Sequence, residues 1–150
     1  MNEPRLHEGV WAVILQQVIV DTGILVALIN RQDQYHDWAL EHLSSISPPL
    51  LTCEAVISEA RFLLGRVRNG RKALLLLLEQ AQVSVGFDLN AEQVAVIDLM
   101  RHYQSVPASV ADAELVRMAE LYPQSSVFTL DSDFQICRKN RNTPIPLITP

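Results

Sequence analysis

Cysteine is scarce in this sequence: Cys53 and Cys137 are the only two among 150 residues, and they do not form a CxxC pair. This scarcity excludes a disulfide scaffold and a cysteine-based zinc site, and it favours reduced thiols in a cytosolic protein. Charged residues make up only 19% of the chain, whereas hydrophobic residues make up 49%. The composition excludes a disordered chain, and the length indicates one domain with a substantial core.

Long hydrophobic runs are also absent. The apolar stretch at residues 10–20 contains Gln16 and Gln17 and is too short to span a bilayer. Glu3 and Glu8 lie upstream of it without a small-residue cleavage site, which is not the pattern of a signal peptide. We therefore expect a cytoplasmic protein with no membrane partner.

The common nucleotide-binding and hydrolytic motifs are missing. The sequence contains no GxxxxGK[ST] or GxGxxG loop, no HExxH zinc motif and no GxSxG nucleophile elbow. A phosphatase with an aspartyl nucleophile needs a second acid two residues after the first, and Gly23 occupies that position after the candidate Asp21. What remains is coordination of a metal ion by oxygen atoms, which suits Mg²⁺ or Mn²⁺ rather than zinc.

The sequence does show an alternation of strand-like and helix-like segments. Strands are expected at residues 13–20, 50–52, 83–87, 127–130 and 145–148. Helices are expected at residues 23–29, 36–45, 53–67, 71–82, 91–103, 110–122 and 134–139, with Thr52, Asn90 and Ser109 as three of the caps. The alternation predicts an α/β fold with a mainly parallel sheet. Because no repeat or linker divides the chain, we expect one domain over residues 1–150, with residues 1–16 as an extension of unknown role.

Four acidic residues stand at apolar or strand-end positions where a carboxylate is costly: Asp21, Glu59, Asp112 and Asp131. Asp21 and Asp131 each follow a predicted strand, so both are expected at the carboxyl edge of the sheet, where ligands bind in open α/β folds. A buried lone carboxylate costs several kcal/mol unless it is paired or binds a metal. The pattern therefore suggests one shared divalent cation, Mg²⁺ or Mn²⁺.

Each acid also has an ordinary structural interpretation. Asp21 and Asp131 are well placed to cap the segments that follow them. Asp112 lies in the first turn of a predicted helix, where the helix dipole favours a negative charge. Glu59 is harder to explain in this way, because helical spacing puts it on the apolar face of its helix. Asp133 is either a spare ligand or a solvated turn residue.

Taken together, the segments that carry these acids resemble PIN-domain ribonucleases, especially the VapC-like toxins of bacterial toxin–antitoxin pairs. The resemblance covers residues 18–148 and depends on the order and spacing of several short motifs. They are Val20-Asp21-Thr22-Gly23, Glu59, Ser109-Val110-Ala111-Asp112-Ala113 followed by Ala119-Glu120, and Thr129-Leu130-Asp131-Ser132-Asp133-Phe134. The first sixteen residues depart from the usual compact start of the family.

The resemblance implies a three-layer α/β/α sandwich and a metal-dependent endoribonuclease. Asp21, Glu59, Asp112 and Asp131 would form the catalytic, metal-binding quartet, in which Glu59 either ligates or orients the attacking water, and Thr129 would supply a supporting hydroxyl. Two alternatives remain open: a catalytically inactive PIN-like module that binds RNA or protein, and an α/β phosphohydrolase acting on small phosphate esters.

The charge distribution bears on the RNA substrate, because the formal net charge is −5. Two groups of basic residues are present: Arg61, Arg66, Arg68, Arg71 and Lys72 form one, and Arg138, Lys139 and Arg141 form the other. Within the first group we expect Arg66, Arg68, Arg71 and Lys72 to bind RNA. Local basic patches hold phosphates even when the total charge is negative. The alternative is that these residues form an ordinary solvated helix face.

The resemblance also implies partners, namely a small antitoxin protein and a second copy of the chain in a homodimer. The expected contact surfaces are the helix of Trp38 and the leucine-rich helix at residues 74–78. The alternative for most of that leucine run is a place in the core.

Overall fold

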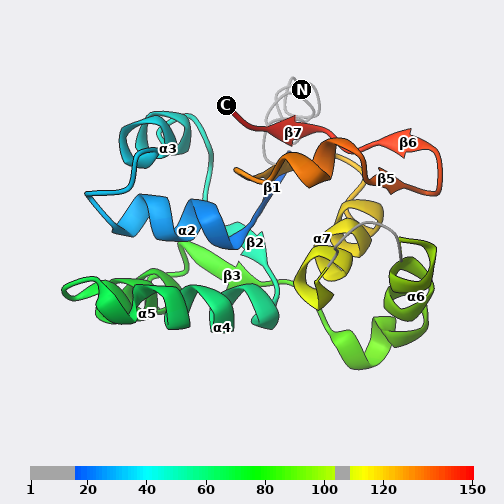
Figure 1. Ribbon diagram of the computed structural model, residues 1–150, viewed down its shortest axis with the longest axis horizontal. Coiled ribbons are helices and arrows are strands. Elements are labelled where there is room, and N and C mark those ends of the chain that lie inside the picture. Colours follow the sequence, from blue (N-terminus) through cyan, green and yellow to red (C-terminus); the bar gives the residue numbers. More distant parts are fainter. Residues whose placement is uncertain (1–15, 104–108) are drawn as a thin grey trace, which may run out of the picture.

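The computed structural model describes residues 16–103 and 109–150, and the fold is given for these residues. A five-stranded parallel sheet forms its centre, in the order β3-β2-β1-β4-β7 (Figure 1). Its strands are β1 (Gln17–Val20), β2 (Leu50–Thr52), β3 (Val83–Val85), β4 (Ser125–Phe128) and β7 (Leu147–Ile148). The predicted α/β fold with a parallel sheet is confirmed.

Helices flank the sheet. They are α2 (Thr22–Ile29), α3 (His36–Leu43), α4 (Glu54–Leu63), α5 (Gly70–Glu79), α6 (Leu89–His102) and α7 (Val110–Leu121). Helix α2 packs against α3, α4 and α5, whereas α7 packs against α6 and the central strands, and Figure 1 shows these two groups on opposite sides. Within the described ranges, no helix is long and apolar enough to cross a membrane.

The central strands carry the core. Ile19, Val20, Val127 and Phe128 are fully buried, as expected for parallel strands that are covered by helices on both faces. Val20 is paired with Phe128 in the register of β1 and β4. The next residue on each strand therefore leaves the sheet at the same carboxyl edge.

The segment after β4 differs from the prediction. Instead of a helix at residues 134–139, the chain forms a short 3₁₀ turn, η2 (Ser132–Gln135), and then β5 (Arg138–Lys139), which pairs antiparallel with β6 (Thr143–Pro144). The predicted helix is wrong because the carbonyl groups that would continue it have another partner. Arg138 Nη1 donates to the carbonyls of Gln135, Ile136 and Cys137 at 2.7–3.1 Å.

Two predicted caps are also wrong. Thr52 stays in β2 and its hydroxyl donates to the Val20 carbonyl at 2.8 Å, so that Cys53 is the N-cap of α4. Helix α6 is capped by Asp88, which accepts a hydrogen bond from the Asn90 N–H.

The first strand begins at Gln17 in the part of the chain that the structure describes. Residues 13–15 of the predicted strand and the extension up to residue 15 lie outside that part.

Candidate metal centre

Asp21 leaves β1 at the carboxyl edge of the sheet and caps α2. Its Oδ1 accepts a hydrogen bond from the Thr22 N–H at 2.7 Å, and its Oδ2 accepts one from the Thr129 hydroxyl at 2.8 Å. The residue is buried, with 8% of its surface exposed. Both carboxylate oxygens are therefore held in one orientation, although each keeps a lone pair for a further partner.

Asp131 comes to the same edge from β4. Its Oδ1 accepts a hydrogen bond from the Asp133 N–H at 2.9 Å, which caps η2. Its own N–H donates to the Thr129 hydroxyl oxygen at 2.9 Å. Since Thr129 is fully buried and also binds Asp21, its hydroxyl connects the two strand-end aspartates.

Asp112 reaches the centre from α7 rather than from the sheet. It forms a capping box with Ser109, in which its Oδ2 accepts from the Ser109 N–H at 3.2 Å and its N–H donates to the Ser109 hydroxyl at 3.1 Å. The predicted Ser109 cap is confirmed. Capping occupies one carboxylate oxygen, so the other oxygen is left for a second interaction.

The three aspartates converge. One carboxylate oxygen each from Asp21, Asp112 and Asp131 lies within 4.8 Å of the other two. Ligands of one hard cation lie about 2.0–2.6 Å from it, so this spacing fits a shared ion after small adjustments. The donor set consists of oxygen atoms alone, which fits Mg²⁺ or Mn²⁺.

The electrostatics of the cluster favour a cation. Burial raises the pKa of Asp21 to about 6 from its ordinary value of 3.8; hydrogen bonds from Thr129 and Thr22 lower it, and the charges of Asp112 and Asp131 raise it further. Burial also raises the pKa of Asp112, to which the charges of Asp131 and Glu59 add. A divalent ion would relieve both the desolvation and the mutual repulsion.

Glu59 lies beside this cluster but outside the group of three. Its side chain is exposed on α4, and its Oε2 accepts a hydrogen bond from the Thr22 hydroxyl at 3.3 Å. The expectation that Glu59 lies on the buried face of its helix is wrong, because that face is narrow: Val56 and Ala60 are fully buried, whereas Leu63 is 47% exposed. Its contribution to the pKa of Asp112 nevertheless places its charge near the centre.

Asp133 is half-buried and lies outside the group of three as well. Its N–H binds Asp131, so its backbone is part of the turn that orients a candidate ligand. Its own carboxylate acts on the neighbouring Cys137, whose pKa is raised first by burial and then by the charges of Asp112, Asp133 and Asp131.

The predicted RNA-binding cluster is some distance from the aspartates. Arg66 and Arg68 line a groove of about 850 Å³ together with residues 30–32, at the C-terminal end of α2. Asp21 lies at the N-terminal end of this eight-residue helix, which is about 12 Å long. Arg71 donates from Nε to the Arg61 carbonyl at 3.0 Å, and Lys72 is exposed.

The second basic group is also divided by the structure. Lys139 is buried, with 8% of its surface exposed, and its Nζ donates to the Pro123 carbonyl at 3.4 Å. Arg141 is exposed and forms an ion pair with Asp98. Lys139 is therefore a structural residue rather than part of a basic surface.

Two polar residues that hold or contact other side chains were missed in the sequence. Thr22 holds Glu59, and its only signal was its position directly after Asp21. Glu114 is buried, with 4% of its surface exposed, and lies close to the Cys53 thiol, whose pKa rises to about 12, first through burial and then through contact with this carboxylate. Its signal in the sequence was an acid between the apolar residues Ala113 and Leu115.

Comparisons with known proteins agree with this geometry. Residues 18–139 match the PIN domain, so the chain belongs to the PIN-domain family, and the predicted family is confirmed. A similar fold occurs in the crystal structure of VapC20 from Mycobacterium tuberculosis, described as a sarcin–ricin loop cleaving toxin. The TM-score is 0.69 at 24% sequence identity, over 80% of this chain and 94% of that one. No curated protein matched the sequence.

Proposed function

We propose that this PIN-domain protein is a metal-dependent endoribonuclease that hydrolyses RNA phosphodiester bonds. The observation that carries the proposal is the convergence of Asp21, Asp112 and Asp131 at the carboxyl edge of the sheet, with the pKa of Asp21 and of Asp112 raised. Membership of a family that generally contains hydrolases, together with the fold shared with an RNA-cleaving toxin, supports RNA as the substrate.

In this proposal the three aspartates hold Mg²⁺ or Mn²⁺ through the oxygens that capping leaves available. A divalent ion held there would supply charge neutralisation for the phosphodiester and a lowered pKa for a water molecule. Thr129 fixes Asp21 and Asp131 relative to each other, and the backbone of Asp133 orients Asp131. Glu59, held by Thr22, either joins the ligands or accepts a hydrogen bond from the attacking water.

The same proposal includes a toxin role in the cytoplasm, with a small antitoxin and a homodimer as partners. Apolar side chains on α4 and α5 support a docking surface, since Phe62 is 76% exposed and Leu63, Leu75 and Leu76 are about half exposed. Leu74 is buried in the core, so only part of the leucine-rich helix is available for a partner. Light scattering that showed a monomer at all concentrations would contradict the homodimer.

The proposed activity is tested by incubating the protein with single-stranded and structured RNAs in Mg²⁺ or Mn²⁺. We expect cleavage that stops on addition of a chelator and that is lost in Asp112→Asn. Binding of RNA without cleavage would favour the inactive module. Hydrolysis of a small phosphate ester in place of RNA would favour the phosphohydrolase.

A further inference from the structure

A second polar cavity, of about 260 Å³, lies between the C-terminal end of α6 and the β5–β6 hairpin. Its charged and aromatic lining is made by Asp98, Arg101, His102, Tyr103, Arg138 and Arg141. Arg138 binds backbone carbonyls with its guanidinium, which leaves Arg101, Arg141 and His102 to face the single carboxylate of Asp98, in a chain whose net charge is −5. The cavity is a local cationic site on an acidic protein.

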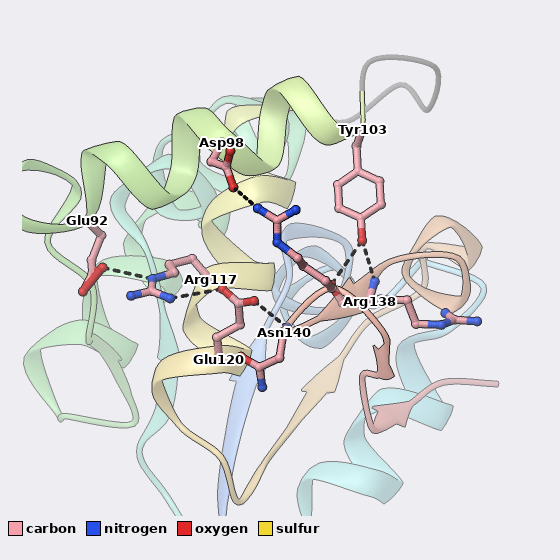
Figure 2. Close-up of polar contacts among 8 residues, drawn as sticks. Glu92, Asp98, Tyr103, Arg117, Glu120, Arg138 and Asn140 are labelled. Atoms are coloured by element: carbon pink, nitrogen blue, oxygen red, sulfur yellow. Dashed lines mark hydrogen bonds and ion pairs between the residues drawn. The ribbon is translucent and has the colours of Figure 1, made fainter.

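The walls of this cavity are fixed by hydrogen bonds (Figure 2). The Tyr103 hydroxyl donates to the Arg138 carbonyl at 3.1 Å and accepts from the Arg138 N–H at 2.8 Å, which holds the end of α6 against β5. The ring of Tyr103 also meets that of His102 edge-on, with centroids 4.8 Å apart. Tyr103 is therefore held in place on one wall of the cavity, and His102 lies against its ring.

The hairpin tip is held in an unfavourable backbone conformation by contacts to two helices. Asn140 and Arg141 both have positive φ, at 51° and 71°, a region that side chains other than glycine seldom adopt. The Asn140 N–H donates to Glu120 on α7 at 2.6 Å (Figure 2). Arg141 pairs with Asp98 on α6 at 3.2 Å. These contacts place the Arg141 guanidinium at the cavity, and Asp98 engages only one of its five N–H donors.

One wall of the cavity is connected to the aspartate centre through the sequence. Arg138 follows directly on Cys137, the thiol that lies within reach of the charges of Asp112, Asp131 and Asp133. Tyr103 binds the backbone of that same Arg138. The chain thus leads from the aspartate centre to one wall of the cavity, which gives an RNA strand held at the aspartates a route toward it.

Resting on the proposed endoribonuclease function, we propose that this cavity binds one nucleotide of a single-stranded RNA whose scissile phosphate lies at the aspartates. Arg101 and Arg141 hold its phosphate, and the base packs against the rings of His102 and Tyr103. Stacking on aromatic side chains next to basic residues is how proteins commonly bind unpaired RNA. A volume just under the 300–1,000 Å³ or so of typical ligand pockets suits a single nucleotide and excludes a duplex.

An acidic peptide would match the charge but would make no use of the aromatic wall. It would also lack a reason to lie beside a centre of three carboxylates, which repel it. A nucleic acid strand, by contrast, carries a base for the rings and a phosphate for the aspartate-bound cation. The observations thus favour RNA.

The test measures binding of a fluorescent single-stranded RNA in chelator, where no cleavage occurs, over a range of salt concentrations. For Arg101→Gln/Arg141→Gln we expect the slope of log K against log salt to decrease in magnitude by about 0.7, since the two arginines hold one phosphate and each neutralised phosphate on a single strand contributes about 0.7. Arg101→Gln alone, which leaves the Asp98–Arg141 pair intact, should give a smaller decrease. His102→Ala should weaken binding about 5- to 150-fold even at high salt, because stacking is lost.

Arg61→Gln is the control, since it removes an exposed positive charge on α4 outside the cavity. Thermal melting of each variant checks that the fold is retained. If the wild type binds RNA and the cavity variants bind as Arg61→Gln does, this inference is overturned while the proposed function stands. A wild type that binds no RNA overturns both. An oligoglutamate peptide that binds more tightly than RNA, and loses binding in the double variant, would replace RNA by an acidic protein segment.

Discussion

Replacing Asp21 by Asn should stabilise the metal-free protein at neutral pH. Burial raises the pKa of this carboxyl to about 6, above its ordinary value of 3.8. The folded state therefore favours the protonated carboxyl, and the stability that this preference contributes is fully present below pH 3.8 and is lost as the pH rises through 6. A rise of this size corresponds to about 3 kcal/mol of destabilisation once the carboxyl is ionised in both states. Asparagine, which does not ionise, avoids that loss.

Part of the gain is offset by hydrogen bonding. The Asn oxygen can still accept from the Thr22 N–H, but its amide would face the Thr129 hydroxyl, which now donates to Asp21 and accepts from Asp131. Losing that donated bond costs about 1 kcal/mol. The net gain for Asp21→Asn is therefore about 1–2 kcal/mol at neutral pH, and it should vanish near the acid end of the range.

Urea denaturation of the wild type and of Asp21→Asn, in chelator and at several pH values from about 4 to about 8, measures this difference. Addition of Mn²⁺ or Mg²⁺ should then stabilise the wild type by about 2.7 kcal/mol at a hundred times its Kd, and the variant far less. Glu41→Gln, which removes an exposed carboxylate on α3, serves as the control. A variant that is less stable than the wild type at every pH, or that responds to metal equally, would refute the reasoning.

Three further changes test other parts of the site. Thr129→Val should cost about 1–3 kcal/mol in urea denaturation and reduce cleavage, because it leaves the half-buried Asp131 N–H without its acceptor; an unchanged stability would contradict this. Glu59→Gln should leave the unfolding midpoint and the stabilisation by metal unchanged but lower the cleavage rate, and a loss of metal response in melting experiments would instead make Glu59 a ligand. Arg66→Gln/Arg68→Gln should reduce the salt slope of RNA binding by about 1.4 if both line the RNA path, whereas an unchanged slope would leave them as solvated residues.

The parts of the fold that follow from local patterning were predictable. Val18, Ile19 and Val20 form a β-branched run that only a buried parallel strand accommodates, so the strand and the position of Asp21 at its end followed from the sequence. Ser109 was recognisable as a helix cap because it is a serine three residues before the acidic Asp112, which is the spacing of a capping box. In both cases the determining contacts lie within a few residues along the chain.

The errors occurred where distant residues decide the structure. Phe134 and its apolar neighbours have helical spacing, but Arg138 takes the carbonyls of residues 135–137, and the chain turns into a hairpin held by Tyr103, which lies 35 residues away. Helical periodicity placed Glu59 on the apolar face of its helix. Periodicity does not show how wide the buried part of that face is, so the expectation was wrong. Leu63 is 47% exposed although it continues the stripe of Val56 and Ala60, and only the folded structure shows this.

Capping and metal binding are two interpretations of the same aspartates, and the structure makes them compatible. Each of Asp21, Asp112 and Asp131 uses one oxygen to cap a backbone N–H, and one oxygen of each still lies within 4.8 Å of the other two. Because a carboxylate can accept about four hydrogen bonds or ligands, capping fixes its orientation without exhausting it. Three acids fixed in this way cannot move apart to reduce their repulsion, and a cation is then the partner that lowers the free energy of the cluster most.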